Sequence, residues 1–197
     1  MAKRAAPEVN AGSMADIAFL LLIFFLVTTT IETDSGINRK LPPIEDPNAK
    51  PPTIKQKNIF TVLLNGKDQL LVEDEVMELK DLRKAAIEFL DNGGDGSCSY
   101  CKGKKDPNSS DNPDKAIISL KNERETTYKT YIAVQNELVA AYNVLRDRRA
   151  PAYGYKTFAE MEALYNDVNW PGNKNKLKDQ IEKIKMAYPQ KLSEVQN

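Results

Sequence analysis

One carboxylate stands in an otherwise apolar run near the start of the chain. Residues 14–31 are 18 residues long, and Asp16 is the only ionisable side chain among them. As a helix this run would extend about 27 Å, enough to cross a hydrocarbon core of about 30 Å. A carboxylate costs about 2.5 kcal/mol or more to insert there, so it usually faces a partner helix or a wet cavity. Asp16 is therefore a candidate proton carrier; the alternative is that it caps the helix or lies at the membrane interface.

A hydroxyl lies on the same predicted helix face. At about 100° per residue, Thr30 projects close to the direction of Asp16, nearly four turns further along. A helix with a carboxyl near one end and a hydroxyl near the other could line a proton path. Alternatively, the threonine cluster marks the membrane interface, and Thr28 and Thr29 bond back to carbonyls of their own helix.

The composition excludes several classes of function. The 197 residues carry 28 basic and 28 acidic side chains and no histidine, so no basic surface suggests nucleic-acid binding. Histidine, the commonest general base and the commonest metal ligand, is therefore missing. We find no glycine-rich phosphate loop and no HExxH motif. We expect a protein that is not an enzyme and has no cofactor and no metal.

The flanks of the apolar run predict its orientation. Residues 1–13 form a short leader in which Lys3 and Arg4 favour a cytoplasmic N-terminus. Everything after residue 32 would then be exported. A cleaved signal peptide is the alternative, but Asp16 and the threonine-rich end of the run are atypical of one. The mean hydropathy of −0.52 indicates that the exported part is polar.

The composition of residues 32–57 predicts an extended tether. They contain Pro42-Pro43, Pro47 and Pro51-Pro52 with charges between them. Such a composition favours extended chain over packed structure.

Residues 58–197 predict a small α+β domain, a two-layer sandwich. Apolar runs predict strands, and helical spacing predicts helices. Asn65-Gly66 is typical of a two-residue hairpin turn. The predicted strands are 58–64, 69–73 and 116–121, and the predicted helices are 78–92 and 126–148.

A polar insertion, residues 93–114, interrupts this pattern and holds the only two cysteines, Cys98 and Cys101. In an oxidising compartment we expect them to form a local disulfide. Thioredoxin-like chemistry and a zinc site shared across a dimer are the alternatives.

The tail forms a second extension, residues 150–189. Thr157 and Glu160 have the spacing of a capping box before one helix, and apolar residues from Leu177 to Tyr188 predict another. Residues 191–195 could then close the sheet. These helices either cover the sheet or form a docking face.

The N-terminal region resembles the ExbD/TolR biopolymer-transport family. The resemblance rests on Asn10, Asp16, the apolar helix that follows, and the pair Leu41-Pro42. It is strong over residues 9–43 and weaker to about residue 146. Family members usually have Thr-Pro after the asparagine, where this chain has Ala11-Gly12.

The resemblance implies a mechanism and a set of partners. Two copies of this helix would sit inside a pentamer of an ExbB- or TolQ-like protein in the bacterial inner membrane, with the C-terminal domain in the periplasm. Asp16 would take up and release protons, with the proton as coupling ion, since a carboxyl in low dielectric can alternate between neutral and charged forms. Movement would pass to a TonB- or TolA-like periplasmic protein to power outer-membrane transport.

The family also implies that the tether contacts a partner through Leu41, Pro42 and Ile44. The alternative function is a membrane-anchored envelope scaffold that binds peptidoglycan or a partner and has no proton role.

Overall fold

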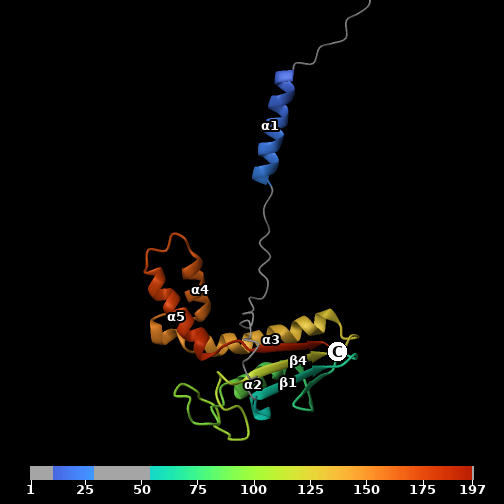
Figure 1. Cartoon of the computed structure of the whole chain (residues 1–197), viewed down its shortest axis with the longest axis vertical. Helices are drawn as coiled ribbons and strands as arrows, with labels where there is room; N and C mark the ends of the chain where they lie inside the picture. The colour runs from blue at the N-terminus through green and yellow to red at the C-terminus, as the bar shows by residue number, and fades with distance from the viewer. Residues whose placement is uncertain (1–10, 29–53, 197) are drawn as a thin grey trace, which may run out of the picture. The chain divides into compact units, whose positions relative to one another are not determined.

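The computed structural model describes residues 11–28 and 54–196 of the chain. These belong to two separate units (Figure 1). The first contains the helix α1, Ala11–Thr28. Within residues 11–28 and 54–196, no helix meets the length and apolarity required to cross a membrane. The predicted span 14–31 continues past the described part of this helix.

The second unit is built on a five-stranded mixed sheet. The strands are β1 (Ile59–Leu64), β2 (Leu70–Val72), β3 (Glu75–Met77), β4 (Ile117–Asn122) and β5 (Leu192–Gln196). Their order is β3-β2-β1-β4-β5. The pairs β1–β2 and β2–β3 are antiparallel, whereas β1–β4 and β4–β5 are parallel. The predicted α+β class is therefore confirmed.

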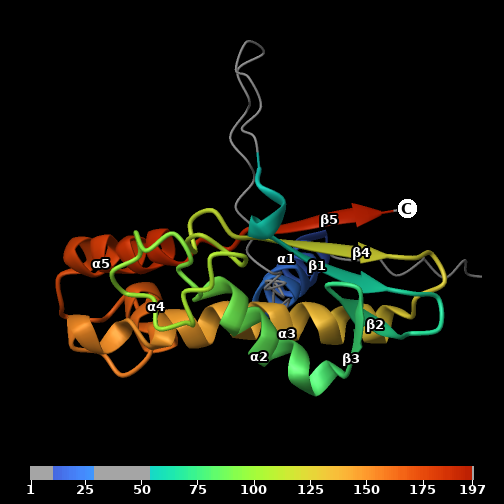
Figure 2. The ribbon, with the colours of Figure 1, turned by 90° about the horizontal axis from the view of Figure 1, so that it is seen from below.

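Two helices cover one face of this sheet (Figure 2). They are α2, Leu79–Leu90, and α3, Tyr128–Asp147. Alternate residues of β1 are buried, as the two-residue period of a strand requires when one face is covered. Phe60 of β1 meets Phe89 of α2 with ring centroids 5.0 Å apart. The main core therefore lies between the sheet and these two helices.

The first hairpin is present, but its predicted turn is wrong. Leu64 pairs with Leu70, so the loop covers residues 65–69 rather than Asn65-Gly66 alone. The Asn65 Oδ1 atom accepts hydrogen bonds from the backbone N–H groups of Lys67 and Gln69, at 3.0 and 2.9 Å. Asparagine thus organises the loop through its side chain, which is its usual role in turns.

The two-residue turn lies one connection later. Val72 pairs with Glu75, which leaves Glu73 and Asp74 as the turn. Both have positive φ, 50° and 68°, as a type I′ hairpin turn requires. The sequence analysis missed this hairpin because Glu-Asp lacks the usual Asn-Gly signature.

A short helical turn precedes the sheet, and an extension follows α3. The turn η1, Gln56–Asn58, takes up the last two residues of the predicted extended tether and the first residue of the predicted strand 58–64, which therefore begins at Ile59. The extension comprises η2 (Ala150–Tyr153), α4 (Phe158–Asn166) and α5 (Lys174–Ala187). It has a small apolar core of its own, so its helices do more than cover the sheet.

The helix starts of the extension follow the capping chemistry that the sequence predicts. The Thr157 hydroxyl accepts from the backbone N–H of Glu160 at 3.1 Å. The Glu160 carboxylate reaches back to the N–H of Lys156, at 2.7 Å, one residue before the usual position. The predicted closing strand, residues 191–195, is confirmed as β5.

Candidate functional site

The first candidate group is the carboxylate of α1. Asp16 is the only ionisable residue of this 18-residue helix. The large apolar side chains of the helix are all exposed. Asp16 follows the first described residue of the helix, Ala11, by five positions. It therefore cannot cap the first turn, because an N-cap side chain must precede that turn. The capping alternative is thus wrong.

The threonines of the predicted proton path are only partly described. The Thr28 hydroxyl donates to the Phe24 carbonyl at 2.7 Å, which confirms the predicted back-bond. Thr29 and Thr30 lie outside the described residues. The tether candidates Leu41, Pro42 and Ile44 also lie outside them.

The insertion is stapled by a disulfide. Cys98 and Cys101 are bonded, with their Cα atoms 5.5 Å apart, and both residues are buried. A zinc site needs thiolates, so the zinc alternative does not hold in this structure. A thioredoxin-like site opens a helix, whereas the chain here continues through turns to β4. The pair therefore pins the loop.

Between the two cysteines, Tyr100 reaches the end of the extension. Its hydroxyl donates to the Ala187 carbonyl at 2.8 Å. Its ring meets that of Tyr188 edge to face, with centroids 5.4 Å apart. The Arg149 guanidinium lies over the Tyr100 ring, 4.6 Å from its centroid. Burial raises the pKa of the Tyr100 hydroxyl, which therefore stays a donor.

Next to this contact lies a buried polar cluster. The Asp91 carboxylate accepts from the Tyr188 hydroxyl at 2.8 Å and from Arg148 Nη2 at 2.5 Å. Its second oxygen accepts from the backbone N–H of Lys102, in the insertion. Burial raises the pKa of Tyr188, and the hydrogen bond to Asp91 adds to this shift. The cluster is a fully paired structural junction rather than a catalytic arrangement.

A second carboxylate holds the other end of the insertion. The Asp111 side chain is only 2% exposed, and its Oδ1 atom lies 2.5 Å from Lys57 Nζ. The backbone N–H of Asp111 donates to Asn58 Oδ1 at 2.8 Å. The Lys57 ammonium is the main cause that lowers the pKa of Asp111, so this carboxylate stays charged.

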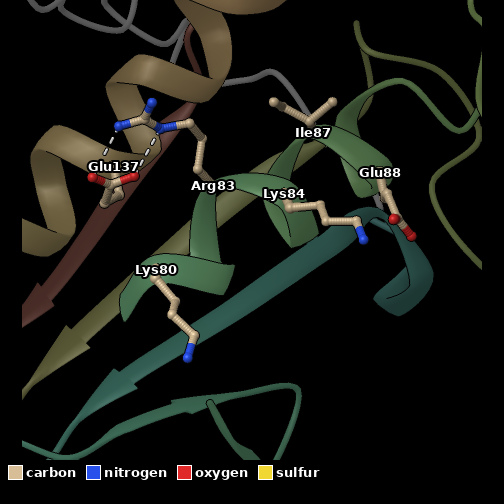
Figure 3. A pocket seen from close by; sticks show the side chains of 6 residues that line it. All are labelled: Lys80, Arg83, Lys84, Ile87, Glu88 and Glu137. Carbon is tan, nitrogen blue, oxygen red and sulfur yellow. Dashed lines mark hydrogen bonds and ion pairs between the residues drawn. The ribbon is translucent and has the colours of Figure 1, made fainter. Parts of the chain in front are cut away.

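An open pocket of about 470 Å³ lies on the surface of α2 (Figure 3). Arg83 turns towards Glu137 of α3 and makes two hydrogen bonds to it, at 2.8 and 3.0 Å. Lys80 and Lys84 extend away from that pair. None of the lining residues is a nucleophile paired with a base, so the pocket has no catalytic arrangement.

The sequence analysis missed the residues that organise this unit, namely Asp91, Tyr100, Asp111 and Tyr188. A polar residue directly after the apolar end of an amphipathic helix, as Asp91 is, was the one available signal. Over the described ranges, no group of three or more potential metal-ligating His, Cys, Asp or Glu side chains comes together.

These observations define a class of protein. A helix-covered mixed sheet follows an apolar helix with one carboxylate, and the polar clusters serve to join segments. The family model of the biopolymer transport protein ExbD/TolR matches residues 2–145, and the chain belongs to this family. The matched range ends within α3, so η2, α4, α5 and β5 lie beyond it. A comparison with curated proteins found no match.

Proposed function

We propose that this chain is the proton-coupled subunit of an ExbB/ExbD-type motor in the bacterial inner membrane. Family membership supports a role in biopolymer transport, either energy-transducing or as a scaffold. The observation that carries the motor role is the single carboxylate of α1, placed within an otherwise uncharged helix. Proton uptake there would change which surroundings the helix tolerates, and this would couple proton flow to movement.

The surface of α1 supports membrane anchoring within a larger assembly. Its large apolar side chains are all exposed, several of them by about 60%, as with Phe19 and Phe25. Apolar surface of this kind is stabilised by lipid or by partner helices. We propose that two copies of this helix pack inside a pentamer of an ExbB/TolQ-type partner. The basic leader, with Lys3 and Arg4, supports a cytoplasmic N-terminus.

The disulfide supports a periplasmic location for the rest of the chain. Disulfides persist in oxidising compartments and are rare in the cytosol. In this arrangement the tether, residues 32–57, links the membrane helix to the α+β domain. Movement would pass from there to a TonB/TolA-type protein, with Leu41, Pro42 and Ile44 as contacts. We assign no catalytic step to this domain.

The test is Asp16→Asn, because Asn keeps the size and polarity of Asp but cannot carry a proton. We expect loss of proton-driven outer-membrane uptake in cells, with normal protein level, membrane insertion and association with the ExbB/TolQ-type partner. Asp16→Glu is the matched control and should retain part of the uptake, because a carboxyl remains.

Normal uptake with Asp16→Asn would overturn the motor role. The protein would then be a membrane-anchored envelope scaffold that binds peptidoglycan or a partner, and the search would move to the exported domain.

A further inference from the structure

Three parallel strands begin at one edge of the sheet, and the insertion lies along that edge (Figure 2). Since β1, β4 and β5 run in the same direction, Ile59, Ile117 and Leu192 all lie at their starting ends. The insertion leads directly into β4. It also contacts the residues that precede β1 and those that precede β5.

At the start of β1, the insertion binds the last residues of the tether. Asp111 is bound by Lys57 and Asn58, as described above, and by Lys55 Nζ at 3.4 Å. Lys57 also donates to the Pro107 carbonyl at 2.8 Å. Three polar contacts thus join the last residues of the tether to the insertion, and Asn58, the next residue, adds two more. The Asp111 carboxylate at their centre is buried.

At the start of β5, two residues of the insertion hold the segment before the strand. Tyr100 contacts Ala187 and Tyr188, which lie five and four residues ahead of Leu192. The Lys191 ammonium donates to the carbonyl of Asp114 and lies 3.4 Å from its carboxylate. The strand β5 is therefore anchored from two points of residues 93–114.

Internal bonds make the insertion a single ordered piece between these two ends. The Asn92 amide donates to the carbonyls of Asp106 and Ser110, both at 2.8 Å. The backbone N–H groups of Gly94 and Asp95 donate to the carbonyls of Ser110 and Asp111. The disulfide closes the turn that presents Tyr100. A displacement of Asp111 would therefore also displace Tyr100.

We propose that residues 93–114 form a collar that couples the tether end of β1 to β5. A displacement of the tether at Lys57 and Asn58 would pass through Asp111 and the braced insertion to Tyr100, and so to the segment before β5. That the displacement comes from the motor rests on the proposed function. The coupling itself does not, because it is a property of the folded domain.

The experiment is a double-mutant cycle in the purified full-length protein in detergent. Asp111→Asn weakens the contacts to the tether, and Tyr100→Leu weakens the contacts to the segment before β5. The hydrogen bonds and ion pairs of these two side chains involve different partners. We expect the folding equilibrium constant of the double variant to differ by about threefold or more from the product of the single effects. We also expect Asp111→Asn alone to speed hydrogen exchange of residues 188–192 by about threefold.

Glu137→Gln is the matched control, because Glu137 pairs with Arg83 away from the collar. The folding equilibrium constant of the variant with Glu137→Gln and Tyr100→Leu should change by the product of the two single effects. The collar would be overturned if the effects of Asp111→Asn and Tyr100→Leu on the folding equilibrium constant simply multiplied, and if Asp111→Asn sped hydrogen exchange only at residues 55–59. If either variant fails to fold by circular dichroism, Lys57→Met and Tyr100→Phe repeat the cycle with milder changes. A failed uptake test at Asp16 would leave this result intact, so the two proposals fail separately.

Discussion

The Tyr188 hydroxyl donates a 2.8 Å hydrogen bond to Asp91, a residue 97 positions earlier in the chain. Asp91 follows the last residue of α2, and Tyr188 follows the last residue of α5. This one bond therefore ties the family-matched part of the domain to the extension beyond it. Arg148, which follows the last residue of α3, donates to both partners. The junction therefore joins the C-terminal ends of α2, α3 and α5.

Removing this hydroxyl should destabilise the domain. In Tyr188→Phe the ring keeps its packing, but Asp91, whose side chain is 5% exposed, loses one donor. A buried acceptor left with fewer partners costs about 1–3 kcal/mol of the free energy of unfolding. Urea unfolding measures this change. The exposed Tyr165→Phe should cost under about 0.5 kcal/mol, and equal effects of the two variants would contradict the junction.

Acid should weaken the tether end of the domain. Lys57 holds the pKa of Asp111 below its ordinary value of 3.8 in the folded protein. A carboxyl with a depressed folded pKa contributes stability that is fully present above its unfolded pKa. That contribution is lost as the pH falls through the unfolded and then the folded pKa. The wild-type protein should therefore exceed Asp111→Asn in stability near neutral pH, and the difference should shrink below about pH 4.

Unfolding free energies of the two proteins at several pH values check this prediction. Asp179→Asn, at an exposed position of α5, controls for the loss of a carboxylate in general. A difference between wild type and Asp111→Asn that stays constant down to acid pH would contradict the assigned role of Lys57.

Most elements of the fold were predictable, because their signals are local. The strand β1 is a nearly continuous apolar run, and the helices α2 and α3 have clear apolar periods. Thr127 and Thr157 begin their helices by capping. The strand β3 was missed because it is three residues long, with Val76 exposed, and follows an unusual turn. Short edge strands depend on pairing with a neighbour, which no local pattern records.

The candidate site was less predictable, because its contacts join distant residues. Asp16 stands out in sequence, since one carboxylate in an apolar run is rare. Asp111 and Tyr188 do not, because their importance comes from partners 53 and 97 residues away. The cysteine spacing indicated a local disulfide, but nothing in it indicated that Tyr100 between them contacts Tyr188.

Breaking the disulfide should cost a moderate amount of stability. The closed loop is short, so the entropy model gives about 2 kcal/mol for Cys98→Ser with Cys101→Ser. Dithiothreitol should lower the stability of the wild-type protein by a similar amount and leave the double variant unchanged. Urea unfolding with and without reductant measures both effects. Sensitivity of the double variant to reductant would contradict this prediction, because no other cysteines are present.

The helical extension should open independently of the sheet. Met161, Leu177 and Ile184 belong to a small core separate from that of the sandwich. Leu177→Ala removes a side chain that is 1% exposed, and such a change costs about 2–5 kcal/mol where the site cannot collapse. Because that loss falls within the small core, we expect faster hydrogen exchange in α4 and α5 but not in β1 or α2. Leu120→Ala, in the main core, should instead speed exchange throughout the sheet and its two helices. If Leu177→Ala speeds exchange in β1 as strongly as in α5, the extension and the sandwich unfold as one unit. The Asp91–Tyr188 junction would then be rigid enough to make the two cores cooperative.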